Sequence, residues 1–251
     1  MALHAMAEQR LFVANPLGAD GEIALTPAQA HYLLHVLRLS AGSRLLVFDG
    51  RNGEWRAEIA AAKKSGCTIR LVEKVREQTA TQDIGYAFAP LKQGRLDYMV
   101  QKAVEMGVSS LQPVITAHTA VSRLNLERMK ANAIEAAEQC GVLTLPDIHA
   151  PVKFETMINT CGKDRVIVYC DERAELSPPL DALEKLRGRK VTALIGPEGG
   201  FSLSERETLL SKSFVYPISL GPRVMRADTA AVAVLALLNA VLGDWRQSLQ
   251  S

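Results

Sequence analysis

The sequence lacks paired cysteines. Its four cysteines, Cys67, Cys140, Cys161 and Cys170, lie far apart and form no C-x-x-C pair. This spacing argues against a zinc site, so we expect no metal, and it indicates reduced thiols in a cytoplasmic protein. No Ser-His-Asp or Cys-His combination stands out either, so the sequence gives no support for a covalent nucleophile.

The chain also lacks a long apolar run. Its first residues, Met1 to Gln9, have no continuous apolar core of the kind that marks a signal peptide, and they are expected to form a loose lead-in. The most apolar run, Ala230 to Leu242, is shorter than the ~20 residues that a bilayer span requires. We therefore expect a soluble protein with no membrane partner.

Net charge is nearly absent. The formal charge is +2 over 251 residues, so any basic surface for nucleic acid must be local. Apolar residues make up 48% of the chain, which is ample for one large core or two small ones.

The chain divides near residue 80. Before that point, short strands alternate with turns at Asp49-Gly50 and Asn52-Gly53. One helix is expected from a capping box at Thr26–Gln29, with proline at its first position. The expected strands are Leu11–Val13, Arg44–Phe48, Glu54–Ala60 and Cys67–Val72. A small β-barrel with one helix is the expected architecture.

A polar segment, Glu77 to Asp83, is the best candidate for a linker. After it, strands and helices alternate, which predicts an α/β domain around a mainly parallel sheet. The expected strands are Ile84–Ala89, Leu111–Ile115, Val166–Cys170, Val191–Ile195 and Phe214–Ser219. One expected helix has an apolar face of Leu96, Met99, Val100 and Ala103 and is closed by Gly107. Further helices are expected from Leu126 to Cys140, with Asn125 as N-cap, near Leu180 to Arg187 and near Glu205 to Lys212, and a last one begins near Asp228.

Two glycine-bearing loops follow two of these strands, which we expect to be neighbours. They are residues 196–202, GPEGGFS, and residues 219–230, SLGPRVMRADTA. Open α/β sheets bind their ligands at such strand ends, and glycines let a backbone approach a flat ligand. The spacing fits neither a Rossmann nor a P-loop motif, and an ordinary strand-to-helix turn is an equal alternative for the first loop.

The second loop carries two charged residues, Arg226 and Asp228, at the start of the last helix. Taken alone, Asp228 could simply cap or charge the helix N-terminus while Arg226 is solvated. The helix is apolar on more than one face, which favours burial in a subunit interface over burial in a thick core. We expect Val234, Leu237, Leu238 and Val241 to lie at that interface.

Basic residues form one cluster, Lys92, Arg95 and Lys102, and are scattered elsewhere, including Arg10 and Arg38. Solvated surface is the usual explanation, and RNA contact is the alternative. His31 and His35 lie one helical turn apart, but no third metal ligand is evident, so a surface or core role is favoured.

The sequences of the two loops resemble the "IGPEGGFS" and "SLGxRILRxETA" segments of the 16S ribosomal RNA uridine-N3 methyltransferases of the SPOUT superfamily. Further matches are residues 10–13, RLFV, residues 31–38, HYLLHVLR, residues 101–108, QKAVEMGV, and residues 135–139, EAAEQ. The resemblance runs nearly end to end. Asp228 stands where that family usually has glutamate.

This resemblance implies a PUA-like β-barrel RNA-binding domain over residues 1–77 and a SPOUT α/β-knot domain, trefoil-knotted around a mainly parallel sheet, over residues 78–251. S-adenosylmethionine would bind in the knot. The cofactor-binding residues implied are Leu194, Gly196, Pro197, Glu198, Gly199, Gly200, Ser219, Leu220, Gly221, Val224, Met225, Arg226 and Thr229. The implied RNA-binding residues are Arg10, Arg38, Lys92, Arg95 and Lys102.

The activity implied is methylation of N3 of one uridine in 16S ribosomal RNA by a homodimer acting on the small ribosomal subunit. Arg226 would stabilise the negative charge that develops on the uracil, and Asp228 would position Arg226 or assist proton removal. Two rivals remain: another knotted RNA methyltransferase, acting on a ribose 2′-oxygen or guanine N1, and a catalytically silent RNA-binding assembly factor.

Overall fold

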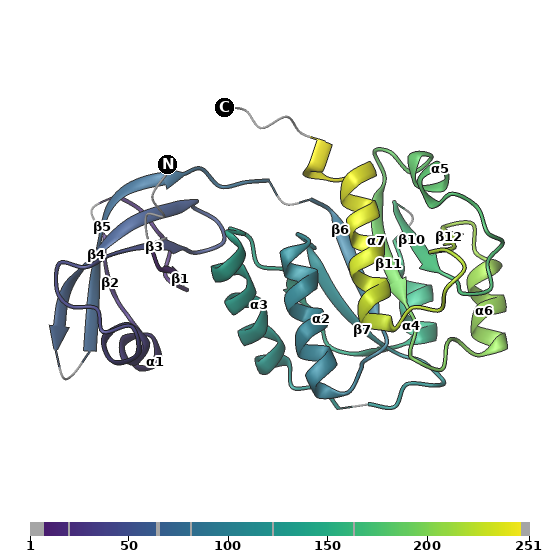
Figure 1. Cartoon of the computed structure of the whole chain (residues 1–251), viewed down its shortest axis with the longest axis horizontal. Helices are drawn as coiled ribbons and strands as arrows, with labels where there is room; N and C mark the ends of the chain where they lie inside the picture. Colours follow the sequence, from purple (N-terminus) through teal and green to yellow (C-terminus); the bar gives the residue numbers. More distant parts are fainter. Residues whose placement is uncertain are drawn as a thin grey trace. The chain divides into compact units, whose positions relative to one another are not determined.

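A computed structural model describes residues 8–19, 21–63, 66–80, 82–121, 123–162 and 164–246. These residues form two compact units (Figure 1). The first contains residues 1–80 and 137–145, and the second contains residues 81–136 and 146–251. The segment 137–145 falls inside the range predicted for the second domain. Most of the lead-in predicted over Met1 to Gln9 lies outside the described residues.

The first unit is built on a five-stranded sheet with the order β1-β3-β4-β5-β2. Its strands are β1 (Arg10–Phe12), β2 (Glu22–Ala24), β3 (Arg44–Phe48), β4 (Glu54–Lys63) and β5 (Gly66–Arg76). Four of these confirm predicted strands, and β2 was missed because three residues carry too little alternation. Leu45, Val47, Ile59 and Ile69 are fully or almost fully buried in the core of this sheet.

The predicted helix start is confirmed. Helix α1 (Pro27–His31) has Thr26 as its N-cap, with both hydrogen bonds of a capping box to Gln29. It continues as a π-helical turn, η1 (Tyr32–Val36), a rare form that often lies at functional sites. Arg38, just beyond this turn, has a φ of 57°, a left-handed conformation that costs a non-glycine residue free energy.

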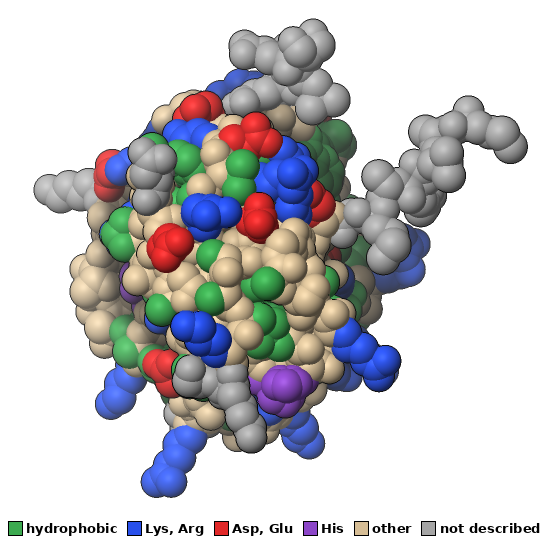
Figure 2. Space-filling model, turned by 90° about the vertical axis from the view of Figure 1, so that its left-hand side faces the viewer, with side chains coloured by type: hydrophobic (Ala, Val, Ile, Leu, Met, Phe, Trp, Pro, Cys, Tyr) green, Lys and Arg blue, Asp and Glu red, His purple; other side chains and the backbone are tan. Residues whose placement is uncertain are grey.

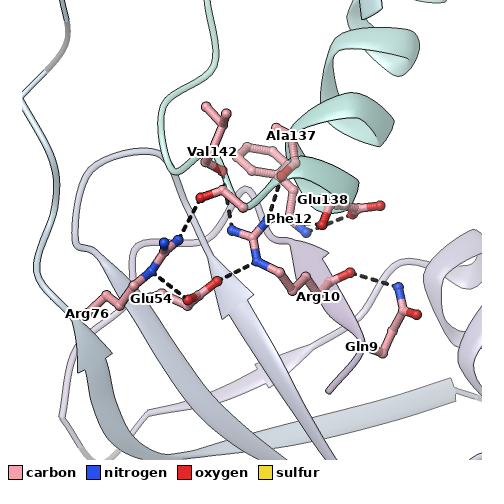
Figure 3. Close-up of polar contacts among 9 residues, drawn as sticks. Gln9, Arg10, Phe12, Glu54, Arg76, Ala137, Glu138 and Val142 are labelled. Carbon is pink, nitrogen blue, oxygen red and sulfur yellow. Dashed lines mark hydrogen bonds and ion pairs between the residues drawn. The ribbon is translucent and has the colours of Figure 1, made fainter. Parts of the chain in front are cut away.

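Arg10 holds residues 137–145 in the first unit (Figure 3). Its Nε donates to the Glu54 carboxylate at 2.6 Å, and its Nη1 donates to the carbonyl oxygens of Ala137 at 2.5 Å and Glu138 at 2.9 Å. Arg76 binds the other oxygen of Glu54 at 2.8 Å. The two guanidinium groups enclose Glu54, and Arg10 supplies donors to a helix C-terminus, where cations are favoured.

The second unit contains a seven-stranded sheet in which all recorded strand pairs are parallel, as predicted. Its main order is β12-β10-β11-β6-β7-β8, and β9 pairs with β7. The strands are β6 (Ile84–Phe88), β7 (Ser110–Ile115), β8 (Asp147–Ile148), β9 (Val152–Lys153), β10 (Arg165–Cys170), β11 (Lys190–Ile195) and β12 (Val215–Ile218). The expectation that the strands before the two glycine loops are neighbours is wrong, because β10 lies between β11 and β12.

Helices cover both faces of this sheet. They are α2 (Gln93–Glu105), α3 (Leu126–Cys140), α4 (Phe154–Thr160), α5 (Pro179–Glu184), α6 (Leu203–Leu210), α7 (Ala227–Val241) and the 3-10 turn η2 (Asp244–Arg246). The last turn of α3, from Ala137, belongs to the first unit. Figure 1 shows α2 and α7 side by side, while α4 and α6 pack against Ala87, Ile167 and Leu194 of the sheet. No described helix is long and apolar enough to cross a membrane.

Helix α7 is buried largely within its own chain. It contacts α2, α5 and β11, and the side chains of Val234, Leu238 and Val241 are at most 4% exposed. The prediction that these three residues lie at a subunit interface is therefore wrong. Of the four residues predicted there, Leu237 is the one that remains half-exposed. The helix is apolar on several faces because it fills a thick core.

Candidate functional site

A cavity of about 500 Å³ opens at the carboxyl ends of β10, β11 and β12. Three loops form its walls: residues 171–176 after β10, 195–201 after β11 and 219–227 after β12. Because the three strands are parallel, their carboxyl ends meet at one edge of the sheet. The volume lies within the range of small-molecule sites.

Most of the predicted cofactor-binding residues line this cavity. They are Gly196, Pro197, Glu198, Gly200, Ser219, Leu220, Gly221, Val224, Met225 and Arg226. Leu194, Gly199 and Thr229 are not among the lining residues. Leu194 is fully buried in the core between the sheet and α4, whereas Gly199 and Thr229 are exposed. Ser202 and Glu205 form the predicted capping box, which fixes the exit of the first glycine loop into α6.

Two glycines have backbone conformations that explain their presence. Gly200 has a φ of 70°, and a Cβ added there would come within 3.0 Å of the Glu172 carboxylate. Gly221 has a φ of 104°, with no atom within 4 Å of such a Cβ. Both positions are strained for residues with a side chain, so the two loops take their course only because glycine is there. Both glycines line the cavity.

Arg226 lines the cavity as the N-cap residue of α7, and its side chain is exposed. Asp228 lies in the first turn of the helix, where its carboxylate accepts a hydrogen bond from the Thr229 N–H at 3.0 Å. Within the described chain, Arg226 and Asp228 form no ion pair with each other. The guanidinium therefore faces the cavity with its charge unneutralised by that carboxylate.

The loop after β10 was missed at the sequence level. Asp171, Glu172 and Arg173 line the cavity together with Arg206 of α6. A signal was present, because Val166–Cys170 was a predicted strand and the residues after it would lie at the same edge as the glycine loops. What the sequence did not reveal was that this strand lies between the other two.

The cavity wall carries an ion pair with a buried carboxylate. The Asp171 side chain is 1% exposed and lies 2.9 Å from Nη2 of Arg206. Hydrogen bonding to Asp171 raises the pKa of Arg206. Burial, and then the charge of Asp171, raises the pKa of Tyr169 well above its ordinary value, so its hydroxyl keeps its proton and donates to Asp171 at 3.3 Å.

Cys170 also lines the cavity, at the end of β10. Burial raises the pKa of its thiol well above the ordinary value. A protonated thiol is a poor nucleophile, which agrees with the absence of a nucleophile motif in the sequence.

The predicted RNA-binding residues have different surroundings. Lys92 is exposed beside the start of α2, Arg95 forms an ion pair with Glu198, and Lys102 binds Glu105 at 2.7 Å. In the first unit Arg38 is exposed, whereas the Arg10 side chain is 12% exposed and is engaged by Glu54 and main-chain carbonyls. An RNA contact by each of these residues stays a prediction.

His31 and His35 lie together on the surface of the first unit, with their ring centroids 5.1 Å apart. Across the residues that the structure describes, no group of three or more metal-ligating side chains is found. Of the surface and core roles that the sequence favoured for this pair, the structure shows the surface one.

The comparisons with known proteins agree with this site. Residues 77–239 match the RNA methyltransferase domain family, and residues 25–72 match the RNA methyltransferase PUA domain family. The chain is 34% identical to ribosomal RNA small subunit methyltransferase E of Synechocystis, over 93% of this chain and 78% of that protein. It is 30% identical to the protein of the same name from Rickettsia conorii, over 92% of this chain and 95% of that protein.

A solved structure is also similar. A methyltransferase from Legionella pneumophila, in complex with the cofactor SAM, is 26% identical with a TM-score of 0.81, covering 95% of this chain and all of that one. The α/β methyltransferase fold with an N-terminal PUA domain is thereby confirmed, while the knotted threading stays a prediction. The chain belongs to the ribosomal RNA small subunit methyltransferase E family, whose members are S-adenosylmethionine-dependent RNA methyltransferases.

Proposed function

We propose that the protein transfers the methyl group of S-adenosylmethionine to N3 of one uridine in 16S ribosomal RNA. One observation carries this proposal: in a chain of this methyltransferase family, a cavity between glycine loops has at its wall an arginine, Arg226, that forms no ion pair with any described residue. The sequence resemblance supports the choice of uridine N3.

The residues of the cavity fit such a cofactor. Gly200 and Gly221 keep the loops free of side chains where they approach the cavity, and Ile195, Leu220 and Met225 provide apolar surface for a flat ring. The loop backbones supply N–H and C=O groups that can recognise an adenine. S-adenosylmethionine supplies a methyl group already activated by its sulfonium.

The chain then has to orient the acceptor and stabilise charge. Loss of the N3 proton leaves negative charge on the flanking uracil oxygens, and Arg226 is a permanently charged group at the cavity wall that can stabilise it. Asp228, two residues further on, would help to position Arg226 and would not be the base that removes the N3 proton. Its carboxylate is engaged by the Thr229 N–H in the first turn of α7.

RNA would be bound by basic residues of both units. Arg38 and Lys92 have exposed side chains, and Arg95 and Lys102 lie on α2 with carboxylate neighbours that RNA phosphates could displace. Figure 2 shows Lys and Arg side chains projecting from the face of the molecule that it displays. Arg10 would contribute least, because its donors already have acceptors.

We further propose that the enzyme is a cytoplasmic homodimer acting on the small ribosomal subunit. Support for a dimer now comes from apolar side chains outside the core: Val224 is 86% exposed beside the cavity, and Leu237 is half-exposed on α7. Light scattering tests this directly. A Leu237→Asp variant should be monomeric, and a wild-type monomer would contradict the proposal.

The experiment that tests the activity compares ribosomal RNA from cells with and without the gene. Mass spectrometry of nucleosides should show 3-methyluridine lost from 16S RNA in the deleted strain and restored by the wild-type gene. Loss of a ribose-methylated or guanine-methylated nucleoside would favour another RNA methyltransferase. An unchanged nucleoside profile, together with no binding of S-adenosylmethionine in calorimetry, would favour a silent assembly factor.

A further inference from the structure

The cavity wall contains an ion pair that the proposed chemistry does not use. Asp171 is 2% exposed and lies directly after β10, and Arg206 lies in the first turn and a half of α6. The Arg206 Nε is 3.0 Å from Oδ2 of Asp171, and its Nη2 is 2.9 Å from the same carboxylate. Both residues line the cavity.

The pair connects the loop after β10 to α6, and the backbone of Asp171 connects the same loop to β12. The Asp171 N–H donates to the Ile218 carbonyl at 3.0 Å, which ties it to the end of β12. The Asp171 carboxylate also accepts from the Arg173 N–H at 3.0 Å, which turns its own loop. Arg206 follows the first glycine loop through the capping box of α6, so the pair fixes that loop as well.

The loop after β10 lies beside the first glycine loop. The Glu172 carboxylate is 3.0 Å from a Cβ added to Gly200, so a side chain at Gly200 would make a tight contact with it. Glu172 and Arg173 both face the cavity. A shift of Asp171 would therefore move two charged side chains at the cavity wall and change the space beside Gly200.

A buried carboxylate such as Asp171 is a poor means of stabilising a fold, because its desolvation offsets much of the Coulombic attraction to its partner. A pair of apolar side chains would fill the same space. The Asp171 carboxylate does provide directional acceptors for a guanidinium, a hydroxyl and a backbone N–H at one point, which apolar packing cannot do.

We propose that Asp171 and Arg206 form a positioning pair that sets the cavity for S-adenosylmethionine by holding residues 171–174 against α6. The inference rests on the proposed function, since it concerns the affinity of that cofactor. Neither residue touches the reacting atoms in this scheme. They act through the loop that carries Glu172 and Arg173.

Calorimetric titration of the purified full-length protein with S-adenosylmethionine tests the inference. Asp171→Asn and Arg206→Met should each weaken binding by about tenfold, and the double variant should be no weaker than the stronger single effect, because both changes break one unit. Arg206→Lys should recover part of the affinity, since lysine keeps the positive charge but lacks the planar guanidinium that donates two hydrogen bonds to one carboxylate. The KM for the cofactor should rise more than kcat falls.

The matched control is Asp97→Asn. Asp97 accepts hydrogen bonds from the Arg128 guanidinium in the same unit, but it does not line the cavity. This variant should leave cofactor affinity unchanged. If Asp171→Asn fails to fold, Arg206→Met and Arg206→Lys carry the test, because Arg206 is partly exposed.

Unchanged cofactor affinity in the Arg206 variants would overturn the positioning role and leave the proposed function intact. Additive losses in the double variant would overturn the pair as a unit. A wild-type protein that does not bind S-adenosylmethionine would overturn the proposed function and this inference together.

Discussion

Each of the two units buries a carboxylate against arginine, and the two carboxylates differ in what surrounds them. Glu54, which is 3% exposed in the first unit, is enclosed by Arg10 and Arg76 (Figure 3). Asp171, which is 2% exposed in the second unit, pairs with Arg206, and both residues line the cavity.

The remaining donors distinguish the two clusters. Arg10 donates further hydrogen bonds to main-chain carbonyls at the end of α3. The first cluster is therefore closed to ligands, and its role is to stabilise the fold. The second cluster holds a loop whose next two residues, Glu172 and Arg173, face open space. The same pair of functional groups thus stabilises a structure in one unit and shapes a binding site in the other.

The largest effect is expected from breaking the closed cluster. Glu54→Ala leaves the guanidinium of Arg10 buried without its carboxylate, which should lower the free energy of unfolding by about 3–5 kcal/mol. Denaturation followed by Trp55 fluorescence, in a Trp245→Phe background, measures this loss in the first unit. Glu73→Ala, which removes the exposed partner of Arg56, is the control and should change stability little. A small loss of unfolding free energy in Glu54→Ala would mean that the first cluster does not stabilise the fold, so the proposed difference between the two clusters would disappear.

Arg226→Ala tests the second unit differently, because it alters the cavity without breaking any ion pair within the part of the chain that the structure describes. Methyl transfer under single-turnover conditions should slow by ~100-fold, as for the loss of one oxyanion donor. Cofactor affinity and stability should stay near the wild-type values, since a group that acts only in the transition state contributes little to ground-state binding. Arg226→Lys should recover part of the rate. A matching collapse of affinity would make Arg226 a binding residue.

Replacing Gly221 tests how far the cavity depends on backbone shape. Gly221→Val puts a β-branched residue at a φ of 104°, a strained conformation that should displace the loop and weaken cofactor binding by roughly tenfold. Gly42→Val is the matched control: Gly42 has a φ of 86° with no atom within 4 Å of an added Cβ, and it does not line the cavity. Equal affinities for both variants in calorimetry would show that the loop does not shape the site.

The smallest effect concerns Arg38, whose left-handed backbone separates it from the other surface arginines. Arg38→Gly removes the steric strain and should raise the free energy of unfolding by about 0.5–1 kcal/mol. The same change should weaken binding of a 16S RNA fragment in a filter-binding assay, because a charge is lost. Increased stability with unchanged RNA affinity would remove Arg38 from the RNA-binding residues.

Much of the fold could be predicted because its signals are local. The capping boxes at Thr26 and Ser202, the N-cap at Asn125, which accepts the Arg128 N–H at 3.0 Å, and the apolar runs of β10, β11 and β12 are all confirmed. The strands β2, β8 and β9 were missed because segments of two or three residues carry no periodicity and form only when a neighbouring strand is present.

The site was only partly predictable. The two glycine loops and Arg226 were identified from their sequence motifs, and they do line the cavity. The loop at Asp171 carries no comparable motif. Its role follows from the position of β10 between β11 and β12, which depends on the order of strands in the sheet.

The sequence by itself determined the two kinds of unit, the glycine loops and the family, because these depend on local backbone preferences and on short sequence motifs. Tertiary structure alone decided that Arg10 binds Glu54 and the end of α3, that α7 fills its own chain's core, and that Asp171 pairs with Arg206. Those partners are separated by many residues in the chain. Burial and charge pairing act through space, so a residue's neighbours along the sequence do not reveal them.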